Sequence, residues 1–165
     1  MRLFIGCFFR IKGYGLLKQT FDPLLKGRWV PEADLHLTFK FLGEVENVAG
    51  IVSALEGIAF PRQKLISCRE IGMFGKRVFY ASCDDPELTR LAGEIDARLA
   101  GCFERENEFV PHVTLMRVQR VDPDVIMPFS GPLPEQVALE GELKVQLIHS
   151  ETGHRGACYH VIREF

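Results

Sequence analysis

Hydrophobic and polar residues along this chain follow two different periods. Apolar residues spaced three and four apart predict helices, and short β-branched or aromatic runs predict strands. The helical stripe is found in 13–27, 47–60 and 84–101, and the first of these is expected to kink or stop at Pro23. Strand-like runs cover 2–9, 35–43, 64–74, 76–83, 111–117, 137–150 and 157–164. The chain is therefore expected to combine a few helices with more numerous strands.

Two of the predicted strands carry the same polar pair. Segment 35–43 contains His36 and Thr38, and segment 111–117 contains His112 and Thr114. Side chains two residues apart on a strand point to the same face, so each copy presents an imidazole beside a hydroxyl. Five histidines and five threonines in 165 residues would produce roughly 0.15 His-x-Thr pairs by chance. Two copies therefore indicate a site built from both strands.

The order of the elements suggests a duplication. Each His-x-Thr strand belongs to a set of strands that contains one helix, as expected of a repeated α+β lobe. A length of 165 residues corresponds to one domain, and 47% apolar residues are enough to form a core. The pattern alone does not show how the two lobes face each other.

Charge and composition restrict the class of protein. A net charge of -2 argues against a protein that holds long nucleic acid through many phosphates, but it is compatible with a small nucleotide or an RNA end. Segment 1–9 is expected to be a buried strand and not a signal peptide. No run approaches the roughly 20 apolar residues of a membrane helix. We expect a soluble, cytoplasmic protein without a membrane contact.

The cysteines and the remaining histidines do not suggest a disulfide framework or a metal site. The five cysteines are odd in number and lack Cys-x-x-Cys spacing, so all are expected to be reduced core thiols. They are Cys7, Cys68, Cys83, Cys102 and Cys158. The other three histidines have no paired ligands at metal spacing and are expected at the surface or at a strand edge. They are His149, His154 and His160.

The two His-x-Thr segments also resemble the two signatures of the 2H phosphoesterase superfamily, and most closely the LigT-like RNA 2',3'-cyclic phosphodiesterases, also called 2'-5' RNA ligases. The resemblance spans nearly the whole chain, but only the two motifs are specific. It implies an α+β fold in a single domain, 1–165, with two pseudo-symmetric lobes. Antiparallel sheets would flank a central cleft, with helices on the outside and one His-x-Thr strand on each wall. Met116 and the pair Phe79-Tyr80 depart from the usual family pattern.

Paired histidines suit the cleavage of a phosphodiester. One neutral and one charged imidazole can take a proton from water and give a proton to the leaving oxygen. The hydroxyls of Thr38 and Thr114 would bind the non-bridging phosphoryl oxygens. The sequence alone does not choose the roles of the histidines; the resemblance implies that His36 donates and His112 accepts. It also implies that Arg117 holds the phosphate or nucleotide, which requires the strand to end or bulge before this residue.

Three further residues near the motifs have two interpretations each. Strand alternation places Lys40 on the His36 face, roughly 13 Å along the strand, where it would lie at the cleft rim or in solvent. Phe74 and Tyr80 would either stack on a nucleobase or pack within the hairpin. These alternatives concern substrate fit and leave the proposed chemistry unchanged.

The resulting hypothesis is a hydrolase that opens RNA or nucleoside 2',3'-cyclic phosphate ends to 2'-phosphates, without a metal or other cofactor and as a monomer. A second hypothesis is the formation or cleavage of 2'-5' RNA linkages by the same two histidines. A third is a nucleotide-binding module of the same fold without catalysis. Intact histidine and threonine in both motifs favour an enzyme over the binding module.

Overall fold

The computed structural model describes residues 1–104, 108–126, 129–153 and 156–165. The helices of these residues are α1 (Tyr14–Phe21), α2 (Val48–Leu55) and α3 (Pro86–Leu99), with a short 3₁₀ helix η1 (Glu32–Asp34). The strands are β1 (Arg2–Phe8), β2 (Arg10–Lys12), β3 (Leu25–Trp29), β4 (His36–Glu44), β5 (Leu65–Cys68), β6 (Glu70–Phe74), β7 (Val78–Ser82), β8 (His112–Val121), β9 (Ser130–Pro132), β10 (Ala138–Glu142), β11 (Gln146–Gly153) and β12 (Gly156–Glu164).

The helices begin and end where local sequence signals place them. The Asp85 side chain accepts a hydrogen bond from the backbone N–H of Glu87, and Pro86 occupies the first turn of α3. Asn47 caps α2 in the same way. Helix α1 ends just before Pro23, and the residues that follow form β3, a strand that the sequence pattern did not predict.

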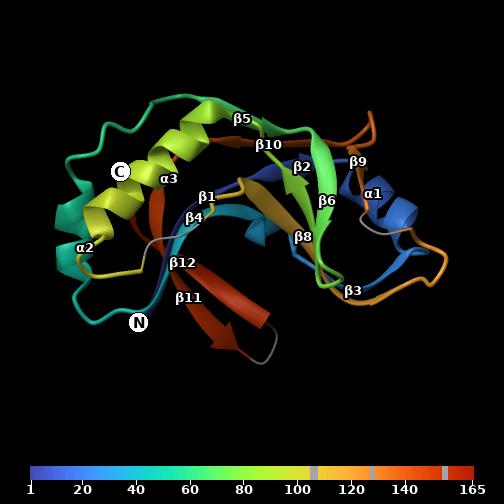
Figure 1. Cartoon of the computed structure of the whole chain (residues 1–165), viewed down its shortest axis with the longest axis horizontal. Coiled ribbons are helices and arrows are strands. Elements are labelled where there is room, and N and C mark those ends of the chain that lie inside the picture. Colours follow the sequence, from blue (N-terminus) through green and yellow to red (C-terminus); the bar gives the residue numbers. More distant parts are fainter. Residues whose placement is uncertain (105–107, 127–128, 154–155) are drawn as a thin grey trace.

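The large sheet is arranged symmetrically about its centre. Its order is β12-β11-β1-β4-β8-β7-β6-β9, with β3 paired to β8, and every pairing is antiparallel. The connections are similar but not identical: β7 leads through α3 directly into β8, whereas β1 leads through β2, α1, β3 and η1 into β4. The predicted α+β fold with antiparallel sheets is confirmed. Figure 1 shows α1 at one end of the molecule and α2 and α3 at the opposite end.

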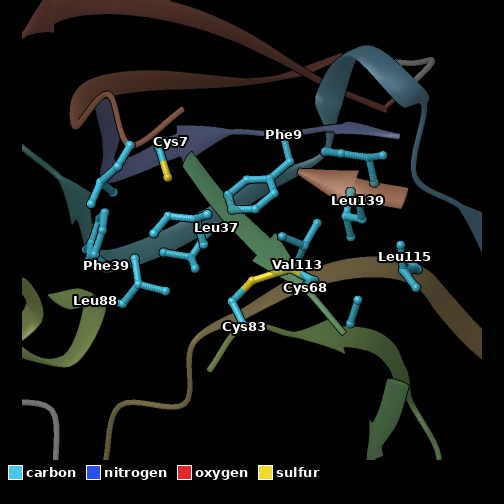
Figure 2. Packing of buried hydrophobic residues seen from close by; sticks show 14 of the residues in the cluster. Cys7, Phe9, Leu37, Phe39, Cys68, Cys83, Leu88, Val113, Leu115 and Leu139 are labelled. Atoms are coloured by element: carbon cyan, nitrogen blue, oxygen red, sulfur yellow. A yellow bond between two sulfur atoms is a disulfide. The ribbon is translucent and has the colours of Figure 1, made fainter. Parts of the chain in front are cut away.

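A second sheet of three strands, β2-β10-β5, covers one face of the centre. Figure 2 shows Leu37 of β4 and Val113 and Leu115 of β8 packed with Leu139 of β10 and Phe9. Apart from Phe9, which is 3% exposed, these side chains have no exposed surface. Because alternate residues of a strand point to opposite faces, the histidines and threonines of β4 and β8 lie on the face away from this core.

The prediction that all cysteines are reduced was wrong. Cys68 at the end of β5 and Cys83 just after β7 form a disulfide, with their Cα atoms 4.2 Å apart (Figure 2). Fifteen residues separate them in sequence, and it is the approach of β5 to the β7 end that brings them together. Cys7, Cys102 and Cys158 are free, and Cys7 is buried. No helix within the described residues is long and apolar enough to cross a membrane.

Candidate active site

A cavity of about 510 Å³ opens on the face of β4 and β8 that lies away from the core. All five residues predicted for the site line it: His36, Thr38, His112, Thr114 and Arg117. The two histidine strands meet directly at its floor, where Leu37 and Val113 pair between them. Fold topology therefore unites two motifs that are more than seventy residues apart in the chain.

Both histidine strands contain a β-bulge at the same place. The pairing of β4 with β1 skips Phe39, and the pairing of β8 with β7 skips Leu115. Each skipped residue is the third after its histidine. A bulge inserts one extra residue and so reverses the alternation of side chains beyond it. Arg117 thereby returns to the face of His112, as its assignment from the family resemblance required, and Phe41 returns to the face of His36.

The same bulge overturns the expectation for Lys40. This residue is only 3% exposed and forms an ion pair with Asp96 of α3. Its ammonium group also donates a hydrogen bond of 2.7 Å to the backbone carbonyl of Glu104. Lys40 is therefore neither at the cleft rim nor in solvent, because simple strand alternation does not hold beyond the bulge.

Each histidine is fixed by a hydrogen bond to the backbone. The Nδ1 atom of His36 lies 2.7 Å from the carbonyl oxygen of Asp34, and that of His112 lies 2.7 Å from the carbonyl oxygen of Val110. A carbonyl oxygen only accepts, so Nδ1 carries the proton and donates in both cases. In each ring Nε2 is then the nitrogen that can exchange a proton with a substrate.

Aromatic rings pack against both imidazoles. The His36 ring lies 4.9 Å from Phe4 and 4.9 Å from Tyr159, measured between ring centroids. The His112 ring lies 4.8 Å from Phe74 and 5.6 Å from Tyr80. Phe74 and Tyr80 stack on each other at 4.2 Å. Of the two interpretations of this pair, the contacts favour packing within the hairpin, where the two rings orient His112.

Burial lowers the pKa of both histidines. For His36 this lowering is opposed by the hydrogen bond to the Asp34 carbonyl and by the Asp34 carboxylate, while the charges of Arg117 and His112 add to it. For His112 the hydrogen bond to Val110 opposes burial, and Arg117 lowers the pKa further. A carboxylate therefore favours the charged form of His36, and none acts in this way among the groups that shift the pKa of His112.

Comparison with known proteins identifies relatives of this chain. The LigT-like phosphoesterase family matches residues 14–80, which include the first His-x-Thr motif. The RNA 2',3'-cyclic phosphodiesterase of Archaeoglobus fulgidus is 32% identical over 140 residues, which cover 76% of this chain and 77% of that protein. The chain belongs to the LigT-like phosphoesterase family. The family predicted from the two motifs is thus confirmed.

Solved structures of LigT-like proteins have the same fold. TT0787 of Thermus thermophilus is 23% identical, with a TM-score of 0.79, and the match covers 100% of this chain and 97% of that chain. LigT of Escherichia coli, crystallised with 3'-AMP, is also 23% identical, with a TM-score of 0.73 and coverage of 99% and 96%. At this level of identity the similarity concerns the fold alone.

The cavity is also lined by residues that the sequence analysis missed. Arg2, Arg28, Phe41 and Tyr159 all line it, together with Asp34. Burial and then Asp34 raise the pKa of Tyr159, and the nearby arginines oppose this shift. The guanidinium of Arg2 lies 5.0 Å from the Phe41 ring centroid. Arg28 lies on β3, which the sequence pattern did not predict, and its place opposite Arg117 depends on the pairing of β3 with β8. No local signal around Arg28 therefore indicated that it lines the cavity.

The remaining histidines lie outside this cavity where they are described. His149 and His160 lie on β11 and β12, opposite each other in the pairing of these strands. Both approach Glu151, at 3.6 and 3.8 Å. His154 falls outside the described residues. Within the described residues, no three or more His, Cys, Asp or Glu side chains lie close enough together to hold a metal ion.

Proposed function

We propose that this protein hydrolyses the 2',3'-cyclic phosphate end of RNA to a 2'-phosphate. One observation carries the proposal: two His-x-Thr pairs line a single cavity, and both imidazoles keep Nε2 available. Relatives of 27 to 35% identity that are named RNA 2',3'-cyclic phosphodiesterase support it. The arginines of the cavity suit an anionic substrate.

The proposed reaction uses both histidines in one displacement. Neutral His112 takes a proton through Nε2 from the attacking water, whose oxygen forms a bond to phosphorus. Charged His36 gives its Nε2 proton to the 3' oxygen as the bond from that oxygen to phosphorus breaks. The product keeps the phosphate on the 2' oxygen, and the two imidazoles exchange their protons with solvent before the next turnover. His112 thus gains one proton and His36 loses one, so protons balance over the reaction.

The electrostatics support this division of roles. Among the described residues that shift the pKa of either histidine, only Asp34 contributes a carboxylate charge, and it acts on His36. This charge favours the protonated form that a general acid requires. His112 has no such partner among the groups that shift it, so it is the better base. Thr38, Thr114 and Arg117 would bind the non-bridging oxygens of the phosphate.

We infer that one chain is sufficient for the reaction. Both histidine strands belong to one sheet, and the cavity is lined from a single chain. We therefore propose that residues 1–165 act as one domain with two pseudo-symmetric lobes and as a monomer. A single elution volume with the mass of one chain in light scattering, at concentrations where the protein is active, would agree with this proposal.

Metal independence follows from the same argument. Two histidines account for both proton transfers, so we expect activity to survive chelation. Full turnover in the presence of excess EDTA is the expected result. Loss of activity in EDTA with recovery on added Zn²⁺ or Mn²⁺ would contradict the proposed mechanism.

The decisive experiment incubates the purified protein with an RNA that ends in a 2',3'-cyclic phosphate. Analysis of the product then shows which hydroxyl keeps the phosphate, and a 2'-phosphate is expected. The His36→Ala/His112→Ala double variant is the control for contaminating nucleases. A 3'-phosphate product would contradict the proposed regiochemistry. Tight binding of a nucleotide without turnover would instead indicate a nucleotide-binding module.

A further inference from the structure

The β3–β8 ladder leads away from the cavity and carries basic residues in two opposed pairs. Arg28 of β3 lies directly opposite Arg117 of β8, and Lys26 lies directly opposite Arg120. All four side chains are exposed. Arg28 and Arg117 line the cavity, so the pair of Lys26 and Arg120 continues from the cavity along the same ladder.

A second bulge of β8 places these four side chains on one face. The pairing with β3 skips Gln119, because Lys26 opposes Arg120 and Gly27 opposes Val118. Without this bulge Arg117 and Arg120, three residues apart, would point to opposite faces. On β3, Lys26 and Arg28 are two residues apart and share a face. The four basic side chains therefore lie on the outer face, on which the cavity opens.

Gly27 allows this close pairing. A Cβ atom at this position would collide with the carbonyl oxygen of Arg117 and would lie 2.9 Å from the Cα atom of Val118. The glycine thus lets β3 approach β8 closely enough to oppose Arg28 to Arg117. Like charges directly opposite each other on neighbouring strands destabilise a sheet. A ladder that carries two such pairs gains stability when an anion lies between them.

The charges of these four residues are not neutralised by ion pairs with other described residues. Lys26 donates a hydrogen bond to the backbone carbonyl of Asp22, which carries no charge. The chain as a whole has a net charge of -2, so this concentration of positive charge is local. The two basic pairs lie about 7 Å apart along β3, at about 3.4 Å per residue. An extended nucleic-acid strand presents its phosphates as a series of anions that such a row can bind.

We propose that this basic ladder, consisting of Lys26, Arg28, Arg117 and Arg120, binds a row of RNA phosphates: Arg117 binds the cyclic phosphate end, and Arg28, Lys26 and Arg120 bind the phosphates on its 5' side. The protein should then prefer an RNA strand of at least a few nucleotides to a cyclic mononucleotide. This inference rests on the proposed hydrolysis of cyclic phosphate ends. Arg28 lies at the border between cavity and ladder, and its guanidinium reaches toward β12, 3.5 Å from the position of a Cβ at Gly156.

The test compares two substrates and two double variants. The substrates are a cyclic mononucleotide and a trinucleotide that ends in a 2',3'-cyclic phosphate. The first variant, Lys26→Ala/Arg120→Ala, removes the basic pair that lies beyond the cavity. The matched control, Arg10→Ala/Lys12→Ala, removes two positive charges two residues apart on β2, a strand of the other sheet.

The expected loss is confined to the longer substrate. For the trinucleotide, the Lys26→Ala/Arg120→Ala variant should lower kcat/KM by about three- to tenfold, mainly through KM. The slope of log kcat/KM against log salt concentration should become shallower by about 1.4, or about 0.7 for each lost single-strand phosphate contact. Turnover of the cyclic mononucleotide should stay unchanged, and the control variant should behave as the wild type with both substrates.

Three results would overturn the inference. They are an equal loss on both substrates, an equal loss in the control variant, and a wild type with the same kcat/KM and salt slope on both substrates. Circular dichroism verifies that the variants fold. Absence of wild-type turnover on both substrates would refute the proposed hydrolysis. In that case fluorescence anisotropy with a labelled trinucleotide still tests the ladder, because equal affinity of the wild type and the Lys26→Ala/Arg120→Ala variant would refute it separately.

Discussion

The two histidine strands share a backbone plan but differ in the charge that surrounds their imidazoles. The first seven residues of β4 and β8 have the same sequence of buried, partly buried and exposed positions. Both have a bulge at the fourth residue and a backbone carbonyl that accepts from the histidine Nδ1. At the exposed sixth position β4 has Phe41, and β8 has Arg117. A symmetric scaffold can therefore hold two similarly oriented imidazoles in different charge surroundings.

The asymmetry comes from residues that are not part of the repeated motif. Asp34 precedes the first motif, whereas Val110 stands at the equivalent position before the second. Each supplies the carbonyl oxygen that fixes its histidine, but only Asp34 adds a carboxylate. The repeated His-x-Thr segments fix the positions of the two imidazoles. The residues that precede them give the imidazoles different charged surroundings. The following predictions test each part of this contrast.

Removing either imidazole should have the largest effect. We expect His36→Ala and His112→Ala each to lower turnover by about 10²- to 10⁴-fold, the usual contribution of one acid-base group. Thr38→Ala and Thr114→Ala should cost less, because they remove one hydrogen bond to the phosphate and no proton transfer. Steady-state kinetics on an RNA cyclic phosphate end measures the effect. Near-full activity in either histidine variant, or a loss explained by unfolding in circular dichroism, would contradict the paired mechanism.

Substitutions at the exposed sixth position should affect activity differently in β4 and β8. We expect Arg117→Ala to lower kcat/KM on a cyclic mononucleotide by about 10- to 100-fold, since a charge-assisted hydrogen bond contributes about 1.5–3 kcal/mol. The equivalent change on β4, Phe41→Ala, removes no charge and should cost less than about fivefold on this substrate. Equal losses in the two variants would show that the sixth position does not create the asymmetry.

The fifth position of each strand should affect stability and not chemistry. β8 has buried Met116 there, and β4 has buried Lys40 paired with Asp96. We expect Lys40→Met to lower the free energy of unfolding by about 1–3 kcal/mol, because it breaks a largely buried charged hydrogen bond. The partly exposed ion pair of Lys64 with Asp85 is the matched control, and Lys64→Met should cost less than about 1 kcal/mol. Equal costs in urea denaturation would refute the structural role of Lys40.

Strand periodicity was sufficient to predict which motif residues lie together in the cavity, but not which residues surround them. His36, Thr38, His112 and Thr114 could be predicted because they lie before the bulges, where alternation by two still holds. Arg117 could be assigned only with the family resemblance, together with the requirement that the strand end or bulge before it. Lys40 was misplaced because its bulge was not anticipated. Bulges arise from the pairing of distant strands, which a local pattern does not contain.

Other errors had the same origin in long-range contacts. Strand β3 escaped prediction because three of its five residues are Lys26, Gly27 and Arg28, which lack the apolar alternation of a half-buried strand. Its pairing with β8, a strand almost ninety residues later, is what makes it a strand. The pairing of Cys68 with Cys83 likewise depends on the approach of two strands. Helices were more predictable, since their caps and stripes are local.

The smallest expected effect concerns the carboxylate that distinguishes His36. Asp34→Asn keeps the backbone carbonyl that accepts from Nδ1 but removes the negative charge, which now raises the pKa of His36. That pKa should therefore fall. If His36 is the general acid, it must be protonated for kcat/KM, so the basic limb of the bell-shaped pH profile should move to lower pH. The acidic limb, which reports the general base, should stay in place because Asp34 is not among the groups that shift His112.

Which of the two limbs moves decides the roles of the two histidines. If His36 were the base, the same drop in its pKa would move the acidic limb to lower pH and leave the basic limb unchanged. Because the two imidazoles interact, each limb belongs to the pair, and the single histidine variants must identify it. Asp124→Asn, at an exposed site outside the cavity, controls for a general effect of lost negative charge. A profile that does not move in Asp34→Asn would show that the asymmetry between the strands has another source than this carboxylate.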